Sequence, residues 1–115
     1  MAEAKSTPQE FNARIVGAGA DQLLYTATLN KVSELKKLII TKEDAVDTLV
    51  ILSDGPVAAS RHILRIAFDT AIWGRERILK EEDLAGFKFG IQGNLVVQVV
   101  TNAVATDFEG AVEEN

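Results

Sequence analysis

The stretch Asn94-Leu95-Val96-Val97-Gln98-Val99-Val100-Thr101-Asn102-Ala103-Val104 has the strongest strand character in the chain, because β-branched residues dominate it and Gly93 marks its start. Successive side chains of a strand point to opposite faces. One face would carry Leu95, Val97, Val99 and Thr101, and the other Val96, Gln98, Val100 and Asn102. Valine on both faces predicts a central strand with a second layer on one side and at least partial cover on the other.

Working outward from this stretch, alternating runs between turn signals predict further strands. The runs cover residues 11–16, 22–28, 34–41, 46–52, 61–69 and 74–79, and residues 87–92 lead into the central stretch. Turns are expected at Gly17–Asp21 and Ser53–Pro56, where glycine and proline interrupt the pattern. Turn signals at this spacing predict an all-β fold, a single β-sandwich or jelly-roll-like barrel of about eight short antiparallel strands.

Two segments fit a helix as well as a strand. Val32, Leu35, Leu38 and Ile39 have helical spacing, but residues 38–41 have strand composition, and we favour a strand. Pro56 could open a helix that extends toward residue 72. The alternation over 61–69 favours a strand there instead, and residues 81–86 are expected to form one helical turn ended by Gly86.

The chain has 115 residues, enough for one domain that folds without disulfides or metal. Residues 1–10 are polar and are expected to form a flexible arm. The sandwich would occupy residues 11–112, and residues 113–115 would be an acidic tail. Residues 106–115 read as a short acidic finish, with Phe108 and Val112 as anchors.

Composition excludes several classes of protein. With 12 basic and 17 acidic residues the net charge is −5, which disfavours nucleic-acid binding. The absence of cysteine excludes disulfide frameworks, zinc–thiolate sites and thiol nucleophiles. No apolar run approaches the roughly 20 residues of a transmembrane helix, and the first ten residues lack the apolar core of a signal peptide. We therefore expect a soluble protein made in a cytoplasm, with no membrane partner.

No residue pattern points to catalysis or to a bound metal. His62 is the single histidine and has no nearby partner in sequence, so a structural or surface role explains it better. The run Glu81–Asp83 suits a solvated turn, since three consecutive acids point in different directions. Four aspartates lie near predicted strand ends, where turn chemistry is the default: Asp44, Asp47, Asp54 and Asp69. We expect no enzyme activity, no cofactor and no metal.

Aromatic and arginine side chains are the candidate interaction residues. Trp73 and Tyr25 could together form a sugar-binding platform, although packing in a core or interface accounts for them more simply. Four arginines alternate along two runs, namely Arg61, Arg65, Arg75 and Arg77. Such a ladder is typical of an interface between subunits and equally of a solvated sheet face. These six residues form the tentative interface.

The order of the segments adds a family resemblance. A Tyr-Thr-Ala strand at 25–27 is followed by Leu38-Ile39-Ile40-Thr41, by Leu49-Val50-Ile51-Leu52-Ser53-Asp54-Gly55 and by a strand ending in Phe68-Asp69. Leu84-x-Gly86-Phe87-Lys88-Phe89 then leads into Gly93-Asn94-Leu95-Val96-Val97-Gln98-Val99. Over residues 11–104 this pattern resembles the small β-sandwich structural proteins of tailed phages and related viruses, of the head-decoration or tail and fibre type. The segments 56–60 and 76–83 depart from it.

The resemblance implies a non-enzymatic virion component, such as a capsid decoration or tail module. Such proteins form homo-oligomers, with a trimer favoured, and bind a capsid or virion surface. It further implies that the arm and an edge strand make the contacts between subunits. The alternative is a small carbohydrate- or ligand-binding module that uses Tyr25, Trp73 and neighbouring acids.

Overall fold

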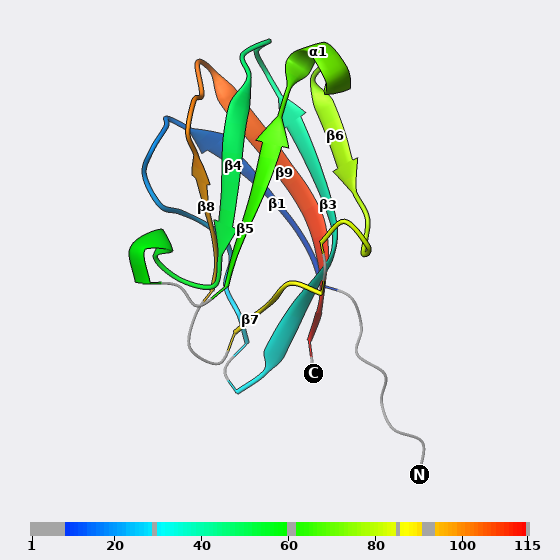
Figure 1. The fold of residues 1–115 in the computed structure, drawn as a ribbon. Coiled ribbons are helices and arrows are strands. Elements are labelled where there is room, and N and C mark those ends of the chain that lie inside the picture. Colours follow the sequence, from blue (N-terminus) through cyan, green and yellow to red (C-terminus); the bar gives the residue numbers. More distant parts are fainter. Residues whose placement is uncertain (1–8, 29, 60–61, 85, 91–93, 115) are drawn as a thin grey trace.

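A computed structural model of the chain describes residues 9–28, 30–59, 62–84, 86–90 and 94–114 (Figure 1). The strands in this part are β1 (Gln9–Val16), β2 (Gln22–Tyr25), β3 (Val32–Lys42), β4 (Thr48–Ser53), β5 (Ile63–Phe68), β6 (Glu76–Leu79), β7 (Lys88–Gly90), β8 (Leu95–Val99) and β9 (Ala105–Glu114). Two short helical turns are η1 (Val57–Ala59) and α1 (Thr70–Trp73). Neither is long or apolar enough to span a membrane.

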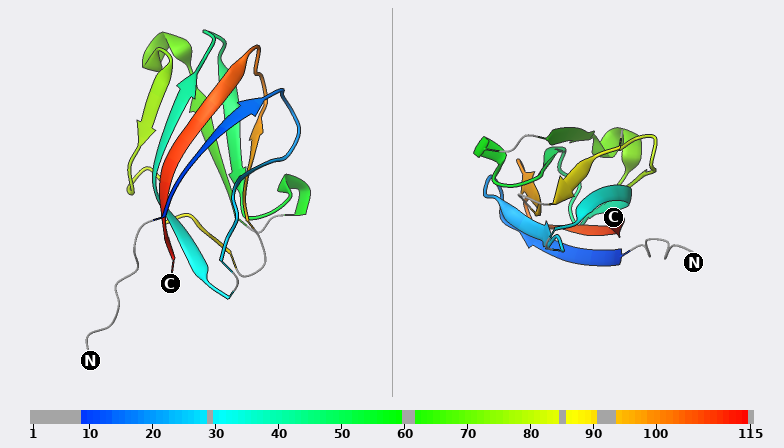
Figure 2. Two further views of the ribbon diagram at one scale, coloured as in Figure 1. Left: turned by 180° about the vertical axis from the view of Figure 1, so that it is seen from behind. Right: turned by 90° about the horizontal axis from the view of Figure 1, so that it is seen from below.

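The strands form two antiparallel sheets packed face to face, as the end-on view in Figure 2 shows. One sheet has the order β1-β9-β3-β6, with β7 also paired to β3, and the other has the order β2-β8-β4-β5. Without the short β7, the eight remaining strands interleave in the order of a jelly roll. The predicted all-β sandwich is therefore confirmed.

The topology follows from folding one long antiparallel ribbon. Strands equally far from the β4–β5 hairpin pair with one another, apart from β7: β4 with β5, β3 with β6, β2 with β8 and β1 with β9. Wrapping this ribbon places alternate pairs in opposite sheets and closes the core between them (Figure 1). The inner faces bury Leu35, Leu38, Ile40, Val50, Leu52, Phe68, Leu95, Val97, Val99 and Phe108.

The stretch around Val97 behaves as the alternation predicts. β8 lies inside its sheet between β2 and β4, and Leu95, Val97 and Val99 are fully buried on the inner face. On the outer face Val96 is partly covered, and η1 contacts β4 and β8. The strand ends at Val99, five residues earlier than expected, because residues 100–104 turn the chain into β9.

The prediction that residues 106–115 form a short acidic finish is wrong. Residues 105–114 are β9, an interior strand that pairs with β1 on one side and β3 on the other. Phe108 and Val112 are buried in the core, while the acidic residues 107, 109 and 113 lie on the partly or fully exposed outer face. Glu114 accepts hydrogen bonds from the Thr28 N–H (3.0 Å) and the Ser33 hydroxyl (3.4 Å). The sheet thus runs from Gln9 to Glu114, beyond the expected bounds of 11 and 112.

Gly110 is required by close packing within this sheet. A Cβ atom at this position would lie 2.6 Å from the Phe11 ring and 2.7 Å from the Lys37 carbonyl oxygen. Real Cβ contacts are not this short, so a side chain would displace β1 or β3. Glycine lets the Phe11 ring cover β9, and this interruption of the apolar pattern also hid β9 in the sequence.

The segment between β4 and β6 resolves the helix–strand ambiguity. Pro56 opens only the turn η1, and Ile63–Phe68 is a strand as preferred. The helical turn α1, which was not expected, follows because the Asp69 carboxylate accepts the Ala71 N–H (2.9 Å). Gly74 ends it with a φ of 67°. Residues 81–84 form hydrogen-bonded turns, where a helical turn was expected, and Gly86 again has positive φ.

Candidate interaction surface

Four connections meet at one end of the sandwich, the upper end in Figure 1. They are residues 17–21, 43–47, 69–75 and 100–104, and we call this region the loop end. Each connection leaves a different strand pair, so the jelly-roll wrapping alone brings them together. The loop end holds the densest polar network in the described part of the chain.

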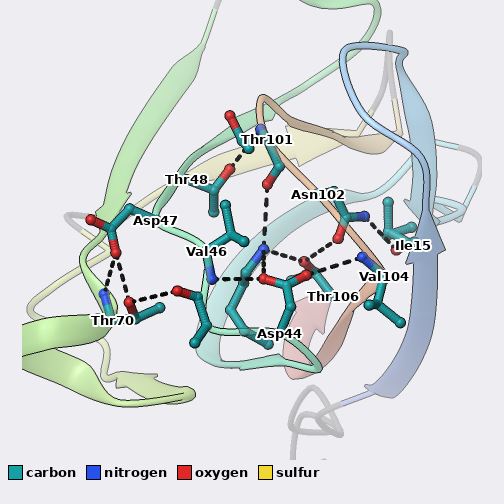
Figure 3. A network of polar contacts seen from close by, with 12 residues as sticks. Ile15, Asp44, Val46, Asp47, Thr48, Thr70, Thr101, Asn102, Val104 and Thr106 are labelled. Atoms are coloured by element: carbon teal, nitrogen blue, oxygen red, sulfur yellow. Dashed lines mark hydrogen bonds and ion pairs between the residues drawn. The ribbon is translucent and has the colours of Figure 1, made fainter.

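Lys42, the last residue of β3, anchors this network inside the sandwich. Its side chain is 0% exposed, and Nζ lies 3.3 Å from Oδ1 of Asp44. Nζ also donates to the Thr101 carbonyl (3.3 Å) and to the Thr106 hydroxyl (3.4 Å). A buried ammonium is tolerated only when paired and hydrogen-bonded, and this arrangement provides both (Figure 3).

Asp44 is the charge partner, with a side chain only 9% exposed. Its burial favours the neutral acid, but N–H groups of Val46 (2.9 Å) and Val104 (3.1 Å) and the Lys42 ammonium outweigh that effect. The net result is that the pKa of Asp44 is lowered. Lys42 donates to the Thr101 carbonyl and Asp44 accepts the Val104 N–H, so the pair joins β3 to the connection that leads into β9.

Further side chains tie the remaining connections to this pair (Figure 3). The Asn102 amide donates to the carbonyls of Ile15 (2.8 Å) and Gly17 (3.0 Å), which fixes the β1–β2 turn. Asp47 accepts the N–H (2.8 Å) and the hydroxyl (2.7 Å) of Thr70, which fixes the start of α1. Polar contacts therefore tie all four connections together, buried at Lys42 and exposed between Asp47 and Thr70.

The four aspartates singled out in the sequence all have polar partners, three of them in turns or caps. Asp44 and Asp47 belong to the loop-end network, Asp69 caps α1, and Asp54 pairs with the exposed His62 at 2.9 Å. Among the residues that the structure describes, no group of three or more histidines and acids could hold a metal ion. The Asp54–His62 pair lies beside a hollow of about 350 Å³ between β5 and residues 84–88.

The loop end also gathers exposed apolar side chains. Four of the large apolar residues exposed in the described part of the chain lie here, Ile72, Trp73, Val100 and Val104, and Val16 ends β1 next to the first connection. Three others, Leu23, Ile63 and Ile78, are spread over the sheets. Ile72 is 71% exposed and Trp73 is 43% exposed. Apolar side chains gathered on rigid connections are a feature of surfaces that bind other proteins.

The structure places the predicted arginines on the facing edges of two sheets. Arg65 is exposed on the outer face of β5, and Arg75 is exposed next to α1. Arg77 of β6 bridges the sheets, because its guanidinium donates to the Ala67 carbonyl and lies 4.4 Å from the centre of the Trp73 ring. The three described arginines therefore do not form a ladder on a single face. Arg61 lies outside the described residues.

Tyr25 is not brought near Trp73. It lies on β2, at the opposite edge of its sheet from β5, and its ring packs 5.8 Å from those of Phe11 and Phe89. Burial and the neighbouring Glu114 carboxylate raise the pKa of Tyr25. The structure thus joins Trp73 with Arg77 and leaves Tyr25 in an aromatic cluster at the edge of the core.

Sequence reasoning missed Lys42, although a signal was present. Leu38, Ile40 and Lys42 alternate along β3, so the alternation that buries the first two also points the lysine inward.

A hollow of about 300 Å³, which no sequence pattern indicated, lies on the outer face of the β1-β9-β3-β6 sheet. Its lining comprises Glu10, Phe11, Asn12, Lys37, Ile39, Glu109, Gly110 and Ala111.

Comparisons of this chain with known protein families, with curated proteins and with solved structures found no match.

Proposed function

We propose that this is a non-enzymatic structural protein that works by forming interfaces, as a homo-oligomer that docks on a larger protein assembly. The observation that carries the proposal is the loop end, where Ile72 and Trp73 face outward from a connection that Asp47 holds by two hydrogen bonds from Thr70. A rigid apolar surface loses little conformational entropy on binding, which favours docking between proteins.

The chemistry of the acidic side chains supports a non-catalytic role. Asp44, Asp47 and Asp69 accept backbone N–H groups that fix turns and caps, which leaves them less able to exchange protons with a substrate. The virion assignment, a capsid decoration or tail module, rests on the sequence resemblance and on the jelly-roll order, a fold used widely in capsids. The analogy of fold suggests the kind of assembly that the protein joins, and the loop end is the surface that we propose to contact it.

Assembly is tested by the solution mass, measured by size-exclusion chromatography with light scattering over a wide concentration range. A homo-oligomer gives a constant whole-number multiple of the 12.5 kDa chain mass. A single-chain mass at every concentration would contradict the proposal.

Docking is tested by co-sedimentation with purified tailed-phage heads. We expect Ile72→Asp to lower the bound fraction about tenfold, because it puts a charge in the centre of a desolvated contact. The matched control is Ile63→Asp, an exposed isoleucine on β5 away from the loop end, which should bind as the unaltered protein does. Equal binding by all three proteins, or none by any, would remove the loop end as the docking surface.

A second candidate function is binding of a small polar ligand such as a carbohydrate. The hollow on the outer sheet face favours it, because Glu10, Asn12, Lys37 and Glu109 present donors and acceptors around the small Ala111. Titration calorimetry against a panel of oligosaccharides tests this function. Binding that is lost in Asn12→Ala would support it, and no heat of binding at millimolar sugar would count against it.

A further inference from the structure

The open edge of β1 is the longest unpaired strand edge in the described residues, since β1 pairs with β9 along its whole length and with nothing else. The direction of its backbone groups follows from its neighbours. The Ala105 carbonyl accepts the N–H of Glu43, which continues β3, so odd-numbered residues of β9 bond toward β3. Even-numbered residues such as Gly110 then bond to β1.

This alternation fixes which groups of β1 are free. Phe11 pairs with Gly110 and therefore directs its backbone groups at β9, as the other odd-numbered residues of β1 do. The N–H and C=O groups of Glu10, Asn12 and Arg14 point away from the sheet. Within the described residues none of these six groups has a partner, whereas the Val16 carbonyl accepts from the Gln22 amide (3.2 Å).

Side chains on this edge carry complementary charges. Glu10, Asn12 and Arg14 lie on the exposed outer face, while Phe11 and Ile15 are buried on the inner face. Glu10 is exposed, and Arg14 is 58% exposed although it also pairs with Glu43 of its own chain. An acid and a base placed symmetrically about Asn12 match an antiparallel copy of the same strand.

We propose that β1 pairs with β1 of a second copy of this chain, antiparallel, about a two-fold axis at Asn12. This arrangement joins the β1-β9-β3-β6 sheets of the two copies into one continuous sheet, with about six new backbone hydrogen bonds. It puts Glu10 of each copy opposite Arg14 of the other and Asn12 opposite its own counterpart.

Other registers place unfavourable pairs in contact. A two-fold axis at Ala13 would put Glu10 opposite Val16, and an axis at Arg14 would put two arginines against each other. Axes between residues would bring odd-numbered residues to the edge, where their backbone groups are already used by β9. The Asn12 register alone satisfies both the backbone direction and the charges.

The inference rests on the proposed homo-oligomer and names the surface that forms it. A two-fold interface is self-complementary and predicts a dimer, in place of the trimer that the resemblance favours. Sheet extension also covers an edge that would otherwise invite uncontrolled strand addition. The loop end stays outside this contact and remains available for docking.

A cysteine cross-link tests the register directly, because the natural chain has no cysteine. Hydrogen-bonded residues across an antiparallel pair have Cα atoms about 5.5 Å apart, within the range that a disulfide spans. Asn12→Cys should therefore form a covalent dimer under mild oxidation. The matched control is Glu109→Cys, which lies beside Asn12 on the same face but one strand further from the axis, and it should stay unlinked.

A charge exchange tests the pairing without a covalent bond. Glu10→Arg places like charges opposite each other twice per dimer, and we expect the dissociation constant from sedimentation velocity to rise about tenfold. Arg14→Glu should weaken the dimer likewise. The double variant Glu10→Arg, Arg14→Glu recreates both pairs in reverse and should restore the dissociation constant to within about twofold.

The outcomes separate this inference from the function on which it rests. A covalent Asn12→Cys dimer together with rescue by the charge exchange supports the β1 contact. An oligomer that neither cross-links at Asn12 nor responds to the charge variants overturns the β1 contact and leaves the homo-oligomer standing. A monomer at every concentration overturns both.

Discussion

The loop end and the β1 edge differ in which groups the fold leaves unsatisfied. At the loop end the polar groups are paired, down to the buried Lys42 ammonium, and apolar side chains such as Ile72 face outward. At the β1 edge Phe11 and Ile15 face inward, and the backbone groups of residues 10, 12 and 14 point out with no partner among the described residues. One sandwich thus presents an apolar surface and a hydrogen-bonding edge.

This difference motivates the two kinds of association that we propose. The apolar loop end gains free energy mainly by excluding water, so its partner has to match its shape. The β1 edge gains from backbone hydrogen bonds, so its partner has to be a strand in the right register. Substitutions at the loop end should therefore lower stability and docking, whereas substitutions at the β1 edge should weaken self-association.

The largest effect is expected at the base of the loop end. Asp44→Ala leaves the buried Lys42 ammonium without its charge partner, which we expect to lower the free energy of unfolding by about 3–5 kcal/mol. Lys42→Met removes the charge and keeps much of the side-chain volume, so it should cost less. Urea unfolding of both variants measures this, and equal losses would contradict the role given to the pair.

The same pair makes stability depend on pH. Because the pKa of Asp44 is lowered in the folded protein, the carboxylate contributes its full stabilisation above the pKa of the unfolded chain. That contribution is lost as the pH falls through the still lower pKa of the folded state. Unfolding curves at a series of acidic pH values should show a shallower decline in Asp44→Asn than in the unaltered protein.

A change beneath the β1 edge should cost less. Gly110→Ala forces a methyl group against the Phe11 ring and the Lys37 carbonyl, and we expect a loss of about 1–3 kcal/mol in unfolding free energy. Where the strain is relieved by a shift of β1, the dimer should weaken as well. Ala111→Gly, the neighbouring position on the outer face, serves as a control that leaves the Phe11 contact in place.

Glu10→Arg should separate the two regions most cleanly. We expect the dimer dissociation constant to rise about tenfold while the thermal unfolding of the monomer changes little, because Glu10 is exposed. Chromatography with light scattering at several concentrations measures the first quantity and circular dichroism melting the second. A large change in the melting temperature with no change in dimerisation would contradict the assignment of Glu10 to the dimer contact.

The smallest effect is expected at α1. Asp69→Ala removes the carboxylate that accepts the Ala71 N–H, which should cost about 1 kcal/mol. The Trp73 ring is held by this turn and by Arg77, so the fluorescence of this single tryptophan should become more accessible to acrylamide. An unchanged quenching constant would show that Arg77 alone positions the ring.

Alternation predicted the fold well wherever one strand face was uniformly apolar. β8 and β3 were recognised because Leu95, Val97 and Val99, or Leu38 and Ile40, repeat every second residue. β9 was missed because Gly110 interrupts the inner face and acidic residues fill the outer one, a pattern that also suits a solvated tail. Local composition does not report the close approach of Phe11 that requires the glycine.

The candidate surfaces were harder to predict, because they depend on which segments meet. Trp73 and Arg77 were singled out, but their contact arises from α1, which was not expected. The arginine runs alternate as a ladder would, yet β5 and β6 belong to different sheets. Lys42 lies on a face that alternation predicts to be buried, and only its distant partners Asp44, Thr101 and Thr106 make that burial tolerable.

The most direct test of the central claim is the mass of the unaltered protein in solution, by light scattering across a hundredfold range of concentration. We expect self-association that plateaus at two copies of the 12.5 kDa chain. A mass of 12.5 kDa that persists at the highest concentration would contradict this expectation, because neither the β1–β1 contact nor the homo-oligomer would then exist.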